Sequence, residues 1–127
     1  MNYNVINNKL KEIKIEEFIW IVYIGIIILS FYSNNLEKKY FLFNDLISKE
    51  KYRKIMILIF SILIIVYFYF FKDSYNSLKS LKFSDSLKKK NLNQLSFIAS
   101  TLILISGIIF LYIALNDEDL DVELAFN

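Results

Sequence analysis

The stretch IMILIFSILIIVYFYFF, residues 55–71, contains no charged residue and decides the fold class. Two similar stretches flank it, FIWIVYIGIIIL at the start of residues 18–33 and LSFIASTLILISGIIFLYIAL at residues 95–115. A bilayer core about 30 Å thick needs about 20 apolar residues in a helix. If residues 18–33 and 55–71 form helices, apolar side chains occupy every side of them, whereas a surface helix of a soluble protein keeps one polar face. We therefore predict an all-α integral membrane protein with three transmembrane helices, at about residues 16–33, 54–72 and 94–115.

Length and composition narrow the function classes. The chain has 127 residues, which we interpret as a single membrane domain covering residues 1–127. It has no Cys, no His and only two Gly, which excludes thiol nucleophiles, His bases, Cys or His metal sites and Gly-rich phosphate loops. We therefore predict no catalytic, cofactor-binding or metal-binding residues. A net charge of +2 is too small to indicate nucleic acid, and the frequent residues with AT-rich codons indicate a low-GC genome.

Positively charged residues predict the orientation. The N-terminal tail and the loop after the second span lie on one side and hold nine Lys residues. The first loop and the C-terminal tail hold six Lys and Arg residues. Because positively charged loops tend to stay inside, we predict a multi-pass protein of the cell membrane with a cytoplasmic N-terminus and an external C-terminus. The basic cluster at residues 49–54 is evidence against this orientation.

Both loops carry local patterns. Apolar residues recur at helical spacing across residues 36–47, which predicts a short interfacial helix between spans 1 and 2 that seats the bundle or docks a partner. The second loop, residues 73–93, is basic and polar. Its Asn91, with Gln94 three residues later, resembles a capping box for the third helix.

The C-terminal tail, residues 116–127, is acidic and lacks Lys and Arg. Negative charge opposes the C-terminal end of a helix dipole, so the third helix should end close to Asn116. Acidic and apolar residues alternate over residues 119–124, which would suit either strand addition to a partner or a solvated tail. The candidate partner-binding residues are Asp117, Glu118, Asp119, Asp121 and Glu123.

Small and hydroxyl residues mark one face of the third span, within an arc of about 120°. In lipid, such residues let helix backbones approach closely and associate. The face could contact Gly25 of the first span, another copy of the chain or another protein. The predicted helix-packing face comprises Gly25, Ser96, Ala99, Ser100, Ser106, Gly107 and Ala114.

The three charge-free stretches lack the ionisable residues that ion and proton pathways usually carry, and no polar groups converge there for chemistry. We predict a small non-catalytic membrane protein, not an enzyme, that acts by helix–helix docking as an accessory, regulatory or immunity-type subunit. The alternative is a self-assembling pore former similar to holins, although the acidic tail departs from the basic tail expected of that class. The predicted partners are the lipid bilayer and either a membrane protein or further copies of the chain, not nucleic acid.

Overall fold

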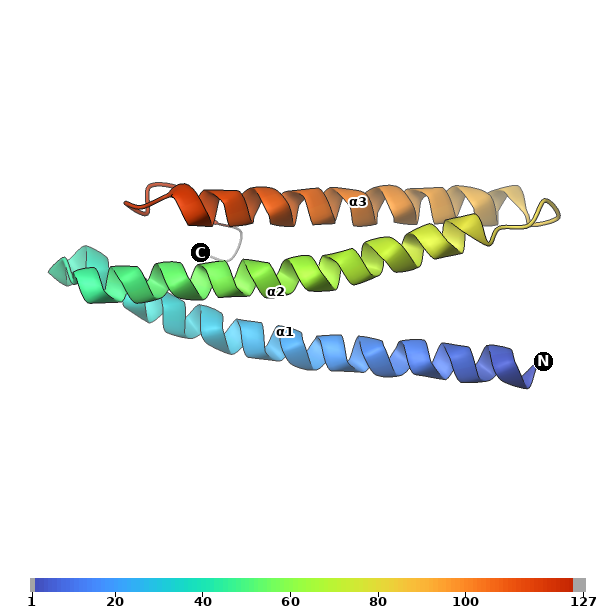
Figure 1. Cartoon of the computed structure of the whole chain (residues 1–127), viewed down its shortest axis with the longest axis horizontal. Helices are drawn as coiled ribbons and strands as arrows, with labels where there is room; N and C mark the ends of the chain where they lie inside the picture. The colour runs from blue at the N-terminus through green and yellow to red at the C-terminus, as the bar shows by residue number, and fades with distance from the viewer. Residues whose placement is uncertain (1, 125–127) are drawn as a thin grey trace.

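Three long helices make up the computed structural model, which describes residues 2–124. They are α1 (Tyr3–Phe43), α2 (Leu46–Lys79) and α3 (Leu87–Asn116). Successive helices run in opposite directions, with α2 in the middle (Figure 1). Both α1 and α3 pack on α2, and within the described residues no Cα of α1 lies within 8 Å of a Cα of α3. All three are long and apolar enough to cross a membrane, as the charge-free stretches predicted.

A two-residue turn joins α1 to α2. Asn44 adopts a left-handed conformation (φ 52°), which Asn tolerates better than most residues. The Asp45 carboxylate then caps α2 by accepting hydrogen bonds from the backbone N–H of Ile47 and from the Ser48 hydroxyl, at 3.1 and 2.8 Å. The predicted interfacial helix is therefore wrong: residues 36–43 continue α1, and Ile47 belongs to α2. The apolar spacing was helical because it belongs to the last turns of α1.

The second connection places the start of α3 earlier than expected. Ser86, not Asn91, caps the helix and accepts a hydrogen bond from the backbone N–H of Lys89 at 3.1 Å. Asp85 supports the turn by accepting from the backbone N–H of Lys82 at 2.7 Å. At its other end α3 stops at Asn116, as the acidic tail predicted.

The best-packed part of the molecule lies toward the turn between α1 and α2. Here α2 contributes residues that are at most 2% exposed, and Phe60 among them stacks on Phe110 of α3 with ring centroids 5.4 Å apart. We call this region the closed end. Its buried members are Ile26, Leu36, Tyr52, Met56, Ile59, Phe60, Leu63, Ala114 and Leu124.

The opposite region is packed more loosely, and we call it the open end. It comprises α1 as far as Tyr23, α2 from Tyr67 onward and α3 as far as Ile103. In Figure 1, α1 diverges from α2 toward its own N-terminus. Consistent with this divergence, the first buried residue along α1 is Ile19.

Candidate functional site

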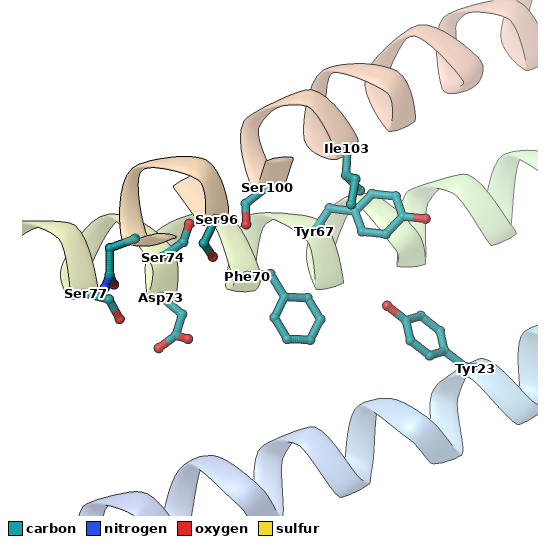
Figure 2. A pocket seen from close by; sticks show the side chains of 10 residues that line it. Tyr23, Tyr67, Phe70, Asp73, Ser74, Ser77, Ser96, Ser100 and Ile103 are labelled. Carbon is teal, nitrogen blue, oxygen red and sulfur yellow. The ribbon is translucent and has the colours of Figure 1, made fainter. Parts of the chain in front are cut away.

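A cavity of about 340 Å³ lies between the three helices at the open end. It forms because α1 diverges there and because α2 and α3 line it partly with small polar side chains. Outside the lining, Phe97 of α3 packs against Phe71 and Tyr75 of α2, with ring centroids 5.4 and 5.9 Å apart. Figure 2 shows side chains of all three helices around it. The lining residues are Tyr23, Tyr67, Phe70, Asp73, Ser74, Ser77, Asn93, Ser96, Ser100 and Ile103.

The side of the cavity nearer the middle of the molecule is aromatic. Tyr23 reaches from α1 toward α2, and Phe70 points from α2 into the space that faces α1 (Figure 2). Tyr67 lies beside them on α2, where its ring also contacts α3 at Gly107. This side therefore offers aromatic surfaces together with the two phenol hydroxyls.

The side nearer the helix ends carries aliphatic hydroxyls. Ser74 is buried and donates its proton to the backbone carbonyl of Phe71 at 2.9 Å, which leaves its oxygen able to accept. Ser96 and Ser100 approach from α3 (Figure 2). Their hydroxyls make no hydrogen bond with any residue in 2–124. These groups remain available to a polar molecule in the cavity.

Asp73 is the acidic residue of the lining and projects from α2 toward α1 (Figure 2). Among the described residues, no hydrogen bond or ion pair satisfies its carboxylate. Burial raises the pKa of Asp73, and the neighbouring carboxylates of Glu12 and Glu16 on α1 raise it further, while Lys9 opposes them. Lys9 itself pairs with Glu12 at 3.7 Å. The local field therefore favours an additional positive charge.

The predicted helix-packing face divides into parts with different surroundings. Gly107 and Ala114 are buried against α2, and a Cβ at Gly107 would lie 3.0 Å from the Tyr67 ring. Ser96 and Ser100 line the cavity. Ala99 and Ser106 are exposed.

A Cβ at Gly25 would meet nothing within 4 Å, so the structure does not bring Gly25 to Gly107.

The acidic tail folds back onto its own chain as far as Leu124. Asp117 accepts hydrogen bonds from the backbone N–H groups of Asp121 and Val122 at 3.0 and 2.9 Å, which closes a tight turn. Asp119 pairs with Lys49 of α2 at 3.3 Å. Leu124 is buried in the closed end.

The other predicted tail residues, Glu118, Asp121 and Glu123, are exposed. Residues 117–124 form turns and bends rather than a strand, and residues 125–127 lie outside the described part of the chain.

Two kinds of residue escaped the sequence analysis. Ser33, Ser48 and Ser74 are small polar residues buried within the bundle. The sequence signal for them is the presence of small residues within the apolar stretches of α1 and α2 or next to them. Asp73 lies just beyond the charge-free stretch, at the start of residues 73–93, which the sequence assigns to the basic loop. Its proximity to that stretch was the available signal.

No family model, curated protein or solved structure matches this chain. Within residues 2–124, no group of three or more acidic residues is arranged to hold a metal ion. The cavity is therefore interpreted from its own side chains.

Proposed function

We propose that this chain is a small multi-pass protein of the cell membrane that acts without catalysis, by docking its helices against another membrane protein as an accessory, regulatory or immunity-type subunit. The lengths and apolar surfaces of the three helices support membrane insertion. In α1 and in α3, only 11% of the most apolar 18-residue stretch is buried inside the molecule. Most of their surface is thus available to lipid or to a partner.

The observation that carries the docking proposal is the unused part of the small-residue face. Gly25 has open space in front of it, and Ala99 and Ser106 are exposed. Small residues at a lipid-facing position allow another helix to approach closely, and close packing is a main source of helix association in membranes. The space in front of Gly107 is already filled by the Tyr67 ring, so Gly107 serves packing within the chain, whereas Gly25 is left for a partner helix.

A self-assembling pore is the competing proposal, and the placement of hydroxyls weighs against it. Ser96, which is exposed, and Ser100, which is partly buried, line the molecule's own cavity, so their hydroxyls border that cavity rather than a surface dedicated to a lumen between copies. Ser106 is exposed, but its hydroxyl donates to the Leu102 carbonyl at 2.8 Å.

The test is crosslinking of a tagged chain in its native membranes, followed by mass identification of the products. A foreign membrane protein at fixed stoichiometry supports docking, and Gly25→Leu should abolish its recovery. An exposed residue on α1, Ile28, offers a matched control as Ile28→Leu. Recovery of self-multiples alone, together with loss of membrane potential on expression, contradicts docking and favours the pore.

Orientation is tested separately, and the absence of native Cys makes the test simple. Phe83, which is 99% exposed in the connection between α2 and α3, and Glu118 in the tail are suitable positions for single Cys substitutions. We expect Glu118→Cys to react with an impermeant thiol reagent in intact cells, and Phe83→Cys to react only after lysis. The reverse result would invert the proposed orientation.

A further inference from the structure

The cavity at the open end has features of a ligand site that helix docking does not require. Its volume of about 340 Å³ falls at the lower end of the about 300–1,000 Å³ found for small-molecule pockets. Its lining combines one carboxylate, several free hydroxyls and three aromatic rings. A cavity that existed only because of imperfect packing would have no reason to combine these groups.

The carboxylate defines the charge of the ligand. Asp73 lacks a partner within the described residues, and Glu12 and Glu16 add negative potential from α1. A partly buried carboxylate such as that of Asp73 is stabilised when it pairs with a cation and accepts hydrogen bonds. Lys9, the cation whose charge acts on Asp73, is already paired with Glu12 at 3.7 Å. The Asp73 carboxylate is therefore available to pair with a cation that does not belong to the chain.

The neighbouring groups define the kind of cation. Aromatic faces at Tyr67 and Phe70 attract cations, as they would any ammonium group. The hydroxyl oxygens of Ser96 and Ser100, however, can accept hydrogen bonds only from a cation that carries N–H groups. A primary ammonium presents three such donors, whereas a quaternary ammonium presents none. The set of acceptors therefore favours a primary ammonium.

The shape of the site indicates that the ligand has an apolar part. Because no Cα of α1 lies within 8 Å of a Cα of α3 in the described residues, the two helices do not pack closely enough to close the space between them. Tyr23 and Ile103 lie on the side of the cavity nearer the middle of the molecule. An alkyl chain attached to the ammonium could leave by this route, along apolar helix surfaces.

We propose that this cavity binds an amphiphile with a primary ammonium head, which pairs with Asp73 while its alkyl chain lies between α1 and α3. The position relative to the bilayer rests on the proposed transmembrane helices: Tyr23, Tyr67 and Ser100 fall within the predicted spans, and Asp73 and Ser77 lie just beyond the second. The head then lies at the membrane interface and the chain in the hydrocarbon. Both an ethanolamine phospholipid and a free alkylamine have this chemistry.

The first experiment measures binding of octylamine to the purified full chain in a neutral detergent by native mass spectrometry. Asp73→Asn keeps the shape of the side chain and removes its charge, and we expect about tenfold weaker binding or more. Glu17→Gln is the matched control, because Glu17 is an exposed carboxylate of α1 outside the cavity lining. It should bind octylamine as the wild type does. Octyltrimethylammonium should bind the wild type about tenfold more weakly than octylamine.

The second experiment distinguishes the two sources of the ammonium group. The chain is placed in nanodiscs of choline phospholipid with a minor fraction of ethanolamine phospholipid, and the lipids that remain bound are identified. Enrichment of the ethanolamine lipid by the wild type but not by Asp73→Asn supports a lipid ligand. Binding of octylamine that depends on Asp73, without lipid enrichment, supports a free amine.

The proposal is overturned if Asp73→Asn binds octylamine as the wild type does, or if the quaternary amine binds as tightly as the primary one. Circular dichroism checks that the variants remain helical. If Asp73→Asn fails to fold, Ser100→Leu replaces it, because a leucine there fills the cavity, and loss of octylamine binding is again expected. Failure of this proposal would leave docking intact, since Gly25→Leu tests docking outside the cavity, and carbonate extraction of membranes tests insertion independently.

Discussion

The closed and open ends of this molecule are built from the same three helices but have opposite properties. At the closed end, α2 contributes Met56, Ile59 and Phe60, which are at most 1% exposed. At the open end, the next turns of α2 contribute Tyr67, Phe70 and Asp73, which are partly exposed and line a cavity. The helices do not change in type between the two ends. What changes is the distance of α1 from the other two helices (Figure 1) and the polarity of the side chains that line the space between them.

This difference teaches that small residues do not by themselves close a helix interface. Gly107 lets α3 approach α2 because it has no side chain, and the Tyr67 ring of α2 fills the space that a side chain would take. Farther along, Ser74 on α2 and both Ser96 and Ser100 on α3 line the cavity instead. These side chains are small and α1 diverges there, so the space that they line stays open, although Phe97 of α3 packs on Phe71 and Tyr75 of α2 outside the lining.

The largest effect should come from breaking the closed end. Phe60→Ala removes a ring that is 1% exposed and stacks on Phe110. We expect a loss of about 3 kcal/mol, at the lower end of the range for buried Phe, because lipid rather than water solvates the separated helices. Phe68→Ala is the control, since Phe68 is 54% exposed. Thermal unfolding in detergent micelles measures both, and equal losses would contradict the assignment of the closed end as the core.

A smaller loss is expected at the boundary between the two ends. In Gly107→Leu, a Cβ lies 3.0 Å from the Tyr67 ring, so Tyr67 or α3 must move. Overpacking of this kind costs about 1–3 kcal/mol. Gly25→Leu meets nothing within 4 Å and should leave the melting temperature unchanged. If Gly25→Leu destabilised the isolated chain as much as Gly107→Leu, α1 would have to contact another helix at that position.

The contribution of the acidic tail to the closed end is expected to be smaller again. Leu124→Ala removes a buried side chain from the core. We expect a loss of about 1–2 kcal/mol, below the about 2–5 kcal/mol of a leucine in a helix core, since a short tail can shift to fill the space. Glu123→Ala, next to it and exposed, is the control for a change in the tail itself. No difference between the two variants would show that the tail does not pack in solution.

The sequence was sufficient for features that depend on one helix at a time. Charge-free stretches predicted three helices, and the acidic tail predicted the end of α3 at Asn116. Features that depend on two helices were not accessible in the same way. The face on α3 was recognised from its small residues, but its neighbour is Tyr67 on α2 rather than Gly25. Helical periodicity gives the direction of a face and contains no information about which helix covers it.

The prediction of an interfacial helix was wrong, and the cavity was not predicted at all, for related reasons. Apolar spacing across residues 36–47 is helical, but the sequence does not distinguish a new helix from the continuation of α1 into a short turn. Only the capping bonds of Asp45 define the break. The cavity requires the divergence of α1, which no single residue encodes. Asp73 gained its importance from that divergence, since in a closed bundle it would be one more interfacial charge.

The smallest expected effect concerns how stability changes with pH. Asp45 at the closed end and Asp73 at the open end should change it in opposite directions. Hydrogen bonds from the Ser48 hydroxyl and backbone, and from the Ile47 N–H, lower the pKa of Asp45. Asp45 therefore contributes stability that is present above its ordinary pKa of 3.8 and is lost as the pH falls through the lowered value. Burial and the carboxylates of Glu12 and Glu16 raise the pKa of Asp73. Its contribution is present below 3.8 and is lost as the pH rises through the raised value.

Melting temperatures recorded across the acidic range in wild type, Asp45→Asn and Asp73→Asn measure this difference. Asn is also a good helix N-cap, so Asp45→Asn keeps the cap and should remove part of the acid destabilisation. Asp73→Asn should remove part of the loss that accompanies rising pH, so the two variants should change the pH profile in opposite directions. A shift in the same direction in both would mean that the open end does not hold Asp73 near other carboxylates. The unpaired negative charge, which separates that cavity from an ordinary packing defect, would then be absent.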